Sequence, residues 1–200
     1  MAKPIYSSPL SHLSLSPRPS EQTAETSLAD LGRVGFFHVL ARKDKAAETA
    51  VQMGVSITPG QAAHLEGGGV AFPTAPGEWM IICAASTANE ELSRWRVQLE
   101  GAAYISDQSH GRAALRLSGP YAARLLAKEC TVDLHLSHLP TGSFAQTQLA
   151  GIGVLIHRIS DTPSFDLYCY SGFADSFWHW LTDAGAEFGL QTYQKDQADG

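Results

Sequence analysis

The two halves of this chain echo each other. Gly67-Gly68-Gly69-Val70 reappears as Gly151-Ile152-Gly153-Val154, 84 positions later, and Cys83 reappears as Cys169 after 86. Four further pairs follow the same order: Ala46-Ala47 with Ala122-Ala123, Pro59-Gly60 with Pro140-Thr141-Gly142, Pro76 with Pro163, and Trp95 with Trp180. Echoes that keep one order indicate a duplication, and so long a period indicates two half-domains rather than a solenoid.

The sequence pattern of each half predicts a strand, a helix, a Pro/Gly loop, a hairpin of strands and a second helix, in that order. In the second half, Ala113, Leu115 and Leu117 alternate with Arg112, Ala114 and Arg116, which is typical of a half-buried strand. A hairpin is predicted over 152–159 and 165–170, around the turn at 161–164. Strands and helices mixed in this way predict an α+β fold with mostly antiparallel sheets.

Helix signals follow both predicted hairpins. Thr87-Ala88-Asn89-Glu90 has the pattern of a capping box, and Ser171 is placed to cap the last helix. An apolar stripe at helical spacing follows each signal: Leu92, Trp95 and Leu99 in the first half, and Phe173, Phe177, Trp180, Leu181 and Ala184 in the second.

Composition changes at both ends of the chain. Residues 1–30 contain seven Ser and four Pro with few large apolar groups, which predicts a disordered arm or a strap that a partner orders. Residues 31–190 are expected to form a single duplicated domain, with halves at about 31–102 and 103–190. Residues 191–200 are polar and are expected to be a frayed tail.

Charge and cysteine content narrow the class of protein. Lys and Arg number 14 against 20 Asp and Glu, and the net charge of −6 argues against a nucleic-acid binder, which needs a basic face. The longest apolar run, 79–85, is far short of a membrane span, and the N-terminus lacks a secretory segment. Three cysteines without a CxxC pair fit a reducing compartment, so we expect a cytoplasmic protein with no membrane or nucleic-acid partner.

Two clusters resemble catalytic or metal sites. Asp133, His135 and His138 lie within six residues, but zinc needs three or four converging ligands and no second cluster accompanies them. Asp107-Gln108-Ser109-His110 holds the residue types of a hydrolase triad, but adjacent side chains usually point apart and no G-x-S-x-G elbow is present. We therefore predict neither a metal site nor a triad.

The remaining candidates also have simpler interpretations. Gly67-Gly68-Gly69 lacks the Lys-Ser/Thr of a phosphate-binding loop and is followed by Val-Ala-Phe-Pro rather than by a helix, so a bulge or hairpin is expected. The three cysteines have no adjacent base and are expected to be buried and inert. From its residues alone, the chain is more like a binding or structural module than an enzyme.

Several motifs resemble one family in particular. They occur in order along the chain: Gly77-Glu78-Trp79, Asp107-Gln108-Ser109-His110-Gly111-Arg112, Leu117-Ser118-Gly119-Pro120, Leu126-Ala127-Lys128-Glu129-Cys130, Asp133-Leu134, Pro140-Thr141-Gly142 and Trp178-His179-Trp180-Leu181. This pattern resembles the gamma subunits of heterotetrameric sarcosine oxidase over most of residues 28–190, most densely over 104–190.

A more remote resemblance joins the second half to the aminomethyltransferase (glycine-cleavage T-protein) family, whose folate-binding fold is built on duplicated α+β halves. That family has an acidic pair at the start of a strand that ends in an aromatic residue and Arg. The corresponding residues here are Ile152 and Gly153, ahead of His157-Arg158, and the nearest downstream acid is Asp161. Neither side chain can take up a proton. The resemblance therefore implies the fold without its catalytic group.

The resemblance to the oxidase family implies a role in a complex of alpha, beta, gamma and delta chains. Such a complex oxidises sarcosine with oxygen and tetrahydrofolate to glycine, hydrogen peroxide and methylenetetrahydrofolate. The family places FAD and FMN with beta, with the FMN towards the alpha–beta boundary. It places NAD and the tetrahydrofolate site in alpha, and zinc in delta. This chain has no Rossmann G-x-G-x-x-G and no zinc cluster, so none of these cofactors is expected in it.

The resemblance thus implies a non-catalytic assembly subunit of an oxidoreductase, and no catalytic, cofactor-binding or metal residue is assigned. Two alternatives remain open at this point. One is a stand-alone folate-binding or aminomethyl-transferring protein, and the other is a hydrolase that uses Ser109 and His110.

Overall fold

The computed structural model describes residues 8–13, 15–17 and 25–194, which form two compact units. One unit comprises Val34–His110 and contains a five-stranded sheet. The other combines the chain before Val34 with the chain from Gly111 onward and contains a six-stranded sheet. We call them the five-stranded and six-stranded units.

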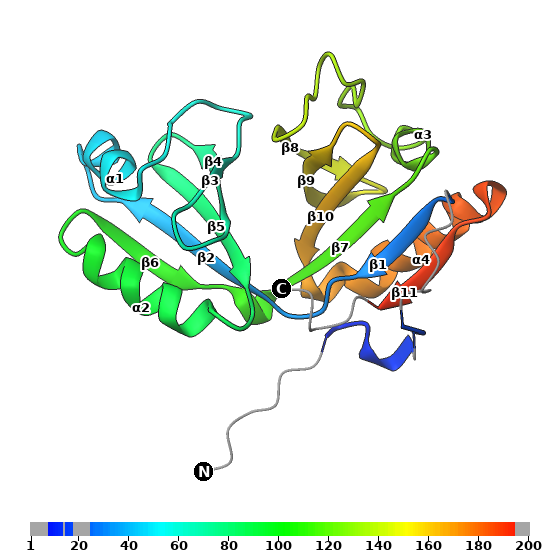
Figure 1. The fold of residues 1–200 in the computed structure, drawn as a ribbon, viewed down its shortest axis with the longest axis horizontal. Helices are drawn as coiled ribbons and strands as arrows, with labels where there is room; N and C mark the ends of the chain where they lie inside the picture. Colours follow the sequence, from blue (N-terminus) through cyan, green and yellow to red (C-terminus); the bar gives the residue numbers. More distant parts are fainter. Residues whose placement is uncertain (1–7, 14, 18–24, 195–200) are drawn as a thin grey trace, which may run out of the picture. The chain divides into compact units, whose positions relative to one another are not determined.

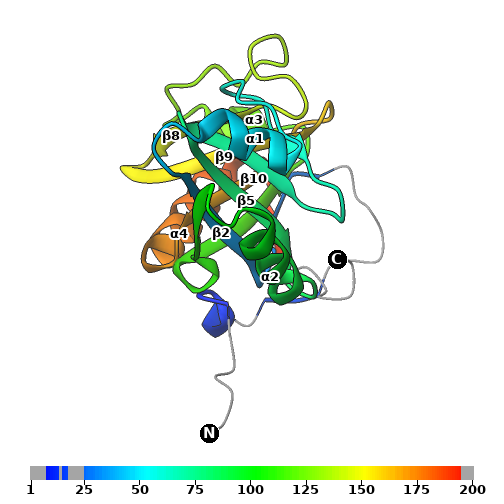
Figure 2. The same ribbon diagram turned by 90° about the vertical axis from the view of Figure 1, so that its left-hand side faces the viewer.

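The five-stranded unit carries its two helices on one face of its sheet (Figures 1 and 2). Its elements are β2 (Val34–Ala41), α1 (Ala46–Met53), β3 (Ala63–His64), β4 (Val70–Ala75), β5 (Glu78–Ala84), α2 (Ala88–Gln98) and β6 (Ala103–Asp107), and the strand order is β3-β4-β5-β2-β6. Alternate residues Phe37 and Val39 of β2 point into the core with Trp79 of β5, and Trp95 of α2 closes it. All sheet pairings here are antiparallel.

From β7 onward, the strands and α-helices of the six-stranded unit follow the same order as those of the five-stranded unit. The six-stranded unit contains the 3-10 turn η1 (Ser11–Leu13), β1 (Ser27–Asp30), β7 (Arg112–Ser118), α3 (Ala122–Leu126), β8 (Phe144–Leu149), β9 (Ile152–Ser160), β10 (Ser164–Tyr170), η3 (Ser171–Phe173), α4 (Ala174–Gly185), η4 (Ala186–Phe188) and β11 (Gln191–Gln194). The short 3-10 turn η2 (Ser109–Gly111) spans the boundary between the two units. The strand order of the six-stranded unit is β11-β1-β7-β10-β9-β8, antiparallel except where β11 joins β1 in parallel. Its core joins Leu115 and Phe165 of the sheet to Leu125 of α3 and Phe177 of α4.

The α+β fold with mostly antiparallel sheets, predicted from the sequence, is therefore present in both units. Each unit also has one strand that the predicted hairpins lack, β3 in the first and β8 in the second. The sequence echo of Cys83 and Cys169 has a structural counterpart. Cys83 is the sixth residue of β5 and faces Gly35 of β2, and Cys169 is the sixth residue of β10 and faces Ala113 of β7.

The two ends of the chain differ from the expected arm and tail. Residues 27–30 form β1 and residues 191–194 form β11, and both belong to the six-stranded sheet. Leu10 is buried in the core of that unit, and the Ser8 hydroxyl donates to the Asp30 carboxylate at 2.5 Å. Composition missed this packing because a few leucines among Ser and Pro are enough to anchor the segment. The other residues of the arm (1–7, 14 and 18–24) and of the tail (195–200) lie outside the described residues.

The contact boundary between the units also differs from the expected one at 102/103. β6 pairs along its whole length with β2, from Ala103 opposite Ala41 to Asp107 opposite Phe37, so it belongs with the first half. The chain leaves the five-stranded unit only after His110. Within the described ranges, no helix has the length and apolar character needed to cross a membrane.

Candidate functional site

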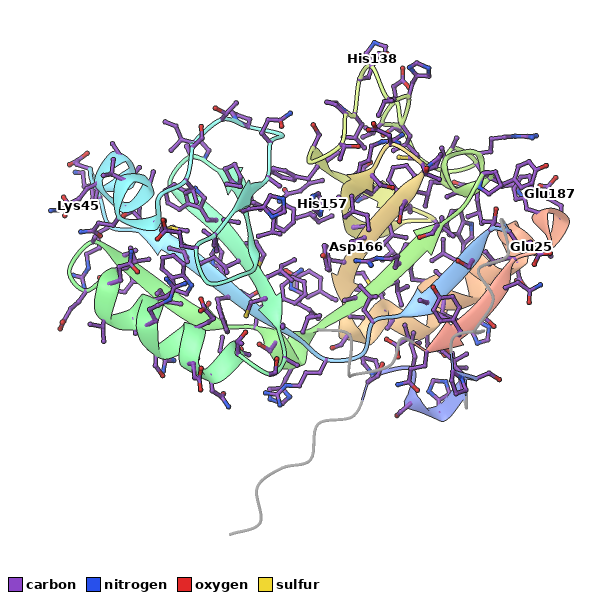
Figure 3. The ribbon with its side chains drawn as sticks, viewed as in Figure 1. Glu25, Lys45, His138, His157, Asp166 and Glu187 are labelled. Atoms are coloured by element: carbon purple, nitrogen blue, oxygen red, sulfur yellow. The ribbon has the colours of Figure 1, made fainter. Side chains whose placement is uncertain are left out.

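A buried group of charged and polar side chains is centred on strand β10, the third strand from one edge of the six-stranded sheet. Because side chains alternate along a strand, Phe165, Leu167 and Cys169 enter the core, and Asp166 and Tyr168 occupy the opposite face. Sheet register places Arg116 of β7 directly opposite Asp166 on one side and His157 of β9 opposite it on the other. Figure 3 labels Asp166 and His157 on these neighbouring strands.

The Arg116 guanidinium forms a bidentate ion pair with the Asp166 carboxylate. Its Nε donates to Oδ1 at 2.6 Å and its Nη2 donates to Oδ2 at 2.9 Å, and the Tyr168 hydroxyl donates to Oδ2 at 3.3 Å. The Asp166 side chain is 9% exposed and that of Arg116 is 32% exposed. The hydrogen bonds to Asp166 raise the pKa of the Arg116 guanidinium, and burial, followed by the nearby Asp166 charge, raises the pKa of the Tyr168 phenol well above its ordinary value.

This arrangement suits structure better than proton transfer. Both carboxylate oxygens of Asp166 accept hydrogen bonds from the Arg116 guanidinium, so their lone pairs are engaged within the sheet. The elevated pKa of Tyr168 keeps its phenol protonated. The cluster therefore binds two strands together and fixes their register. Neither Asp166 nor Tyr168 is a free general base.

A second buried cation, Arg158, pins a loop of the same unit. Its Nη2 donates to the Leu134 carbonyl at 2.7 Å, and its guanidinium lies 4.8 Å from the Phe165 ring centroid. Burial lowers the pKa of this guanidinium, and Asp161 partly opposes the effect. Arg158 thus ties the connection between α3 and β8 to β9 through Nη2, while its Nη1 donates to the Ser160 carbonyl.

The Asp107-Gln108-Ser109-His110 motif forms a turn rather than a triad. The buried Ser109 hydroxyl accepts the Phe36 N–H at 2.9 Å and donates to Asp107 Oδ1 at 2.6 Å, and Asp107 also accepts the Ser109 N–H. His110 takes no part in these bonds. A nucleophile requires its base within reach, and here the hydroxyl contacts the carboxylate directly. Asp30 makes the corresponding turn after β1, accepting the Gly32 N–H at 2.9 Å, so the motif marks a duplicated turn.

The Asp133, His135 and His138 cluster lies in the exposed loop between α3 and β8. His138 Nδ1 is 3.0 Å from Asp133 Oδ2, and Asp133 Oδ1 accepts the His135 N–H. The His135 ring contacts the Ser137 hydroxyl instead of Asp133. Among the described residues, no group of three or more His, Cys, Asp or Glu side chains is arranged to hold a metal ion.

The glycine run forms a turn between two strands, and the positions matched to the aminomethyltransferase acids begin a strand. Gly67, Gly68 and Gly69 have φ near +93° to +104° and form the turn between β3 and β4, where a Cβ on Gly69 would lie 2.8 Å from the Ile82 carbonyl oxygen. Ile152 and Gly153 begin β9, with Ile152 in the core. The next acid, Asp161, accepts the Thr141 hydroxyl at 2.6 Å.

The cysteines are all free thiols. Burial raises the pKa of Cys83 and of Cys169 to about 11, and it also raises the pKa of the partly exposed Cys130. At neutral pH these thiols are protonated and therefore poor nucleophiles.

Sequence reasoning did not find the Arg116–Asp166–Tyr168 cluster. The available signal was the alternation of polar and apolar residues in Ser164–Tyr170, together with the two arginines in the strand at 112–118. That alternation identifies the polar face of each strand but does not specify the pairing register between strands. It therefore cannot predict which arginine lies opposite which carboxylate.

Comparison with known proteins now adds to this geometry. A family model described as the GCVT N-terminal domain matches residues 47–195. The sarcosine oxidase gamma subunit of Corynebacterium sp. (strain U-96) is 29% identical over 200 residues, covering 90% of each chain. The gamma subunit from Arthrobacter sp. is 31% identical over 165 residues, covering 72% of this chain and 79% of that one.

Comparison with solved structures gives relatives of the same kinds as the sequence comparison. The heterotetrameric sarcosine oxidase from Corynebacterium sp. U-96, in complex with pyrrole 2-carboxylate, contains a chain that matches with a TM-score of 0.74 and 25% identity, over 90% of this chain and 95% of that one. The glycine cleavage system aminomethyltransferase T from Bartonella henselae matches with a TM-score of 0.64 over 84% of this chain and 48% of that one. At 18% identity, the second likeness shows the fold alone.

The chain therefore belongs to the GCVT N-terminal domain family. Its relatives over most of their length include gamma subunits of sarcosine oxidase, and this confirms the resemblance drawn from the sequence motifs. The aminomethyltransferase-like fold predicted from the more remote resemblance is confirmed as well.

Proposed function

We propose that this chain is the gamma subunit of a heterotetrameric sarcosine oxidase and that it supports assembly of the complex without supplying a reacting group. The observation that carries the proposal is the match to a sarcosine oxidase gamma subunit across 90% of both chains, together with the structural match to a chain of the heterotetramer. As part of that enzyme, the chain takes part in the oxidative demethylation of sarcosine to glycine.

The partners that we propose are the alpha, beta and delta subunits. FAD and FMN belong with beta in this proposal, NAD and the tetrahydrofolate site with alpha, and zinc with delta. The polar clusters in this chain support that division, because the oxygens of Asp166, the hydroxyl of Ser109 and the terminal nitrogens of Arg158 are all engaged in bonds within the protein. Three unpaired cysteines support a cytoplasmic location.

Co-expression tests this assignment. The chain would carry an affinity tag and be produced with the alpha, beta and delta genes from the same genome. We expect the other subunits to co-purify and the product to show flavin absorption and sarcosine-dependent oxygen uptake. A colourless chain recovered alone, while the other subunits assemble and turn over sarcosine without it, would refute the proposal.

A second candidate is a stand-alone folate-binding protein, and the GCVT family match favours it. The absence of an acid at Ile152 and Gly153 argues against aminomethyl transfer. Calorimetric titration of the isolated chain with tetrahydrofolate separates the two candidates, because a stand-alone protein binds folate without partners. We expect no heat of binding at millimolar ligand.

A further inference from the structure

The two sheets of this chain differ at one edge. In the six-stranded unit, the strand beside β7 is β1, and β1 is covered on its outer side by β11. In the five-stranded unit, the strand beside β2 is β6, and among the described residues no strand lies beyond it. In the part of the chain that the structure describes, the unit with β6 thus has no counterpart of β11.

β1 and β6 occupy equivalent positions in register. In the six-stranded unit Ser27 pairs with Ser118 and Asp30 with Leu115, and in the five-stranded unit Tyr104 pairs with Leu40 and Asp107 with Phe37. The two sets of pairs differ by a constant offset. Adding 77 to a β1 residue number gives its β6 equivalent, and subtracting 78 from a β7 residue number gives its β2 equivalent. Both strands end in the Asp turn described above. The pairing of β11 with β1 therefore serves as a template for how a further strand would pair with β6.

The outer edge of β6 presents backbone groups for pairing. The Ala102 carbonyl accepts the Arg42 N–H at 2.8 Å, and the Gln108 N–H donates to the Phe36 carbonyl at 2.8 Å. Because antiparallel pairs alternate, the even-numbered residues bond to β2, and the N–H and C=O of Ile105 point outward. The template agrees, since the Thr26 carbonyl, the equivalent of Ala103, accepts the Gln191 N–H of β11 at 3.0 Å.

This edge also lacks the protection that strand edges usually carry. β6 contains neither Pro nor Lys, and its pairing with β2 has no bulge. Two of the other three described edges differ: β3 has two residues, and Pro17 bridges to Gln194 of β11.

The side chains beside this edge suit a protein partner. Tyr104 is 58% exposed and Leu40, opposite it, is 41% exposed. The Arg42 guanidinium lies 4.4 Å from the Tyr104 ring centroid, and Lys43 follows it on the surface. Aromatic residues and Arg are enriched where proteins associate. The cations favour a carboxylate near the Ala103 end of the strand.

We propose that an extended segment from another subunit of the oxidase pairs with the outer edge of β6, running parallel to it as β11 runs parallel to β1. The segment places an apolar side chain against Tyr104 and a carboxylate near Arg42 and Lys43. The inference rests on the proposed function, because it takes its partner from the complex. Main-chain hydrogen bonds to Ile105 supply the affinity, and the flanking side chains supply the selectivity.

Amide hydrogen exchange tests the pairing directly. The free chain is compared with the chain in the co-expressed complex, and the amides of 103–107 are followed by peptide mass spectrometry. We expect exchange at Ile105 to be about tenfold slower or more in the complex, because its N–H gains an acceptor. Unchanged exchange over 103–107 in an intact complex overturns the inference while leaving the proposed function standing.

A matched pair of variants isolates the backbone contribution. Ile105→Ala removes most of the side chain and keeps the outward N–H, whereas Ile105→Pro also removes that N–H and leaves the bonds to β2 in place. With both variants folded by circular dichroism, we expect Ile105→Pro to be retained by the complex about tenfold less than Ile105→Ala. Equal retention overturns the proposal.

Two further outcomes distinguish this inference from self-association of the chain and from failure of the proposed function. Protection of Ile105 that grows with concentration in the chain alone identifies a second copy as the occupant and overturns the commitment to another subunit. Failure of the wild-type chain to join any subunit refutes the proposed function itself, and with it the partner assigned here.

Discussion

Replacing Asp166 by Asn gives a test of the strand-binding role of the Arg116–Asp166 pair. The amide keeps the shape of the carboxylate and removes its charge, so the Arg116 guanidinium loses its bidentate acceptor. Breaking a fully buried ion pair costs roughly 3–5 kcal/mol, and an exposed pair contributes about 0–1 kcal/mol. With Asp166 9% exposed and Arg116 32% exposed, we expect Asp166→Asn to lower the free energy of unfolding by about 2–3 kcal/mol.

Urea unfolding, followed by tryptophan fluorescence and far-UV circular dichroism, measures this loss. At a typical slope of about 2 kcal/mol per molar urea, the midpoint should fall by roughly 1–1.5 M. The double variant Arg116→Met/Asp166→Leu should lose about 1 kcal/mol or less, because it leaves no unpaired charge. Glu48→Gln, which breaks the exposed Lys45–Glu48 pair, is the control and should cost less than about 0.5 kcal/mol. If Asp166→Asn matches that control, or if the double variant is as unstable as the single one, the Arg116–Asp166 pair does not hold β7 and β10 together as described.

Three further predictions concern packing and reactivity. Gly35→Ala should destabilise the chain by about 1–3 kcal/mol, because the new Cβ would lie 2.6 Å from a cysteine sulfur, whereas Gly153→Ala, with open space around it, should change stability by less than about 1 kcal/mol in the same urea experiment. Leu10→Ala should cost about 2–4 kcal/mol, whereas His12→Ala should cost less than about 1 kcal/mol because its pairing with Asp175 is exposed; equal midpoints would return this segment to the loose arm that composition predicts. A thiol reagent at pH 7.5 should modify one thiol of the folded chain, Cys130, and three after denaturation. Labelling of the other two, whose pKa values lie near 11, should speed up about tenfold per pH unit; fast labelling of all three in the folded chain would contradict the burial described here.

Local patterns predicted the helices and most strands well. The strand expected over 165–170 is β10, Ser164–Tyr170, and the helix expected after Ser171 is α4, Ala174–Gly185. The capping bonds were wrong: α2 and α4 have no side-chain cap, and the Thr87 hydroxyl donates to the Ala84 carbonyl instead. Such end details depend on how the preceding turn packs, which local sequence does not specify.

Pairings between distant segments were beyond the sequence pattern. Arg116 and Asp166 are 50 residues apart and meet only because β7 and β10 pair in one register. β1 likewise lies next to β7, far along the chain, and β11 joins it from the other end. A short stretch such as Gln191–Gln194 has a single buried apolar side chain, Tyr193, so its place in a sheet is set by the neighbour that it covers.

The central claim is that this chain supports a sarcosine oxidase without supplying a reacting group. The most direct test is the turnover of sarcosine per bound flavin in the complex assembled with Arg116→Met/Asp166→Leu, compared with the wild-type complex. We expect rates within about twofold of each other, because the cluster holds strands together and supplies no reacting group in the proposed function. A loss of a hundredfold or more, in a complex that keeps its subunits and its flavin, would contradict it.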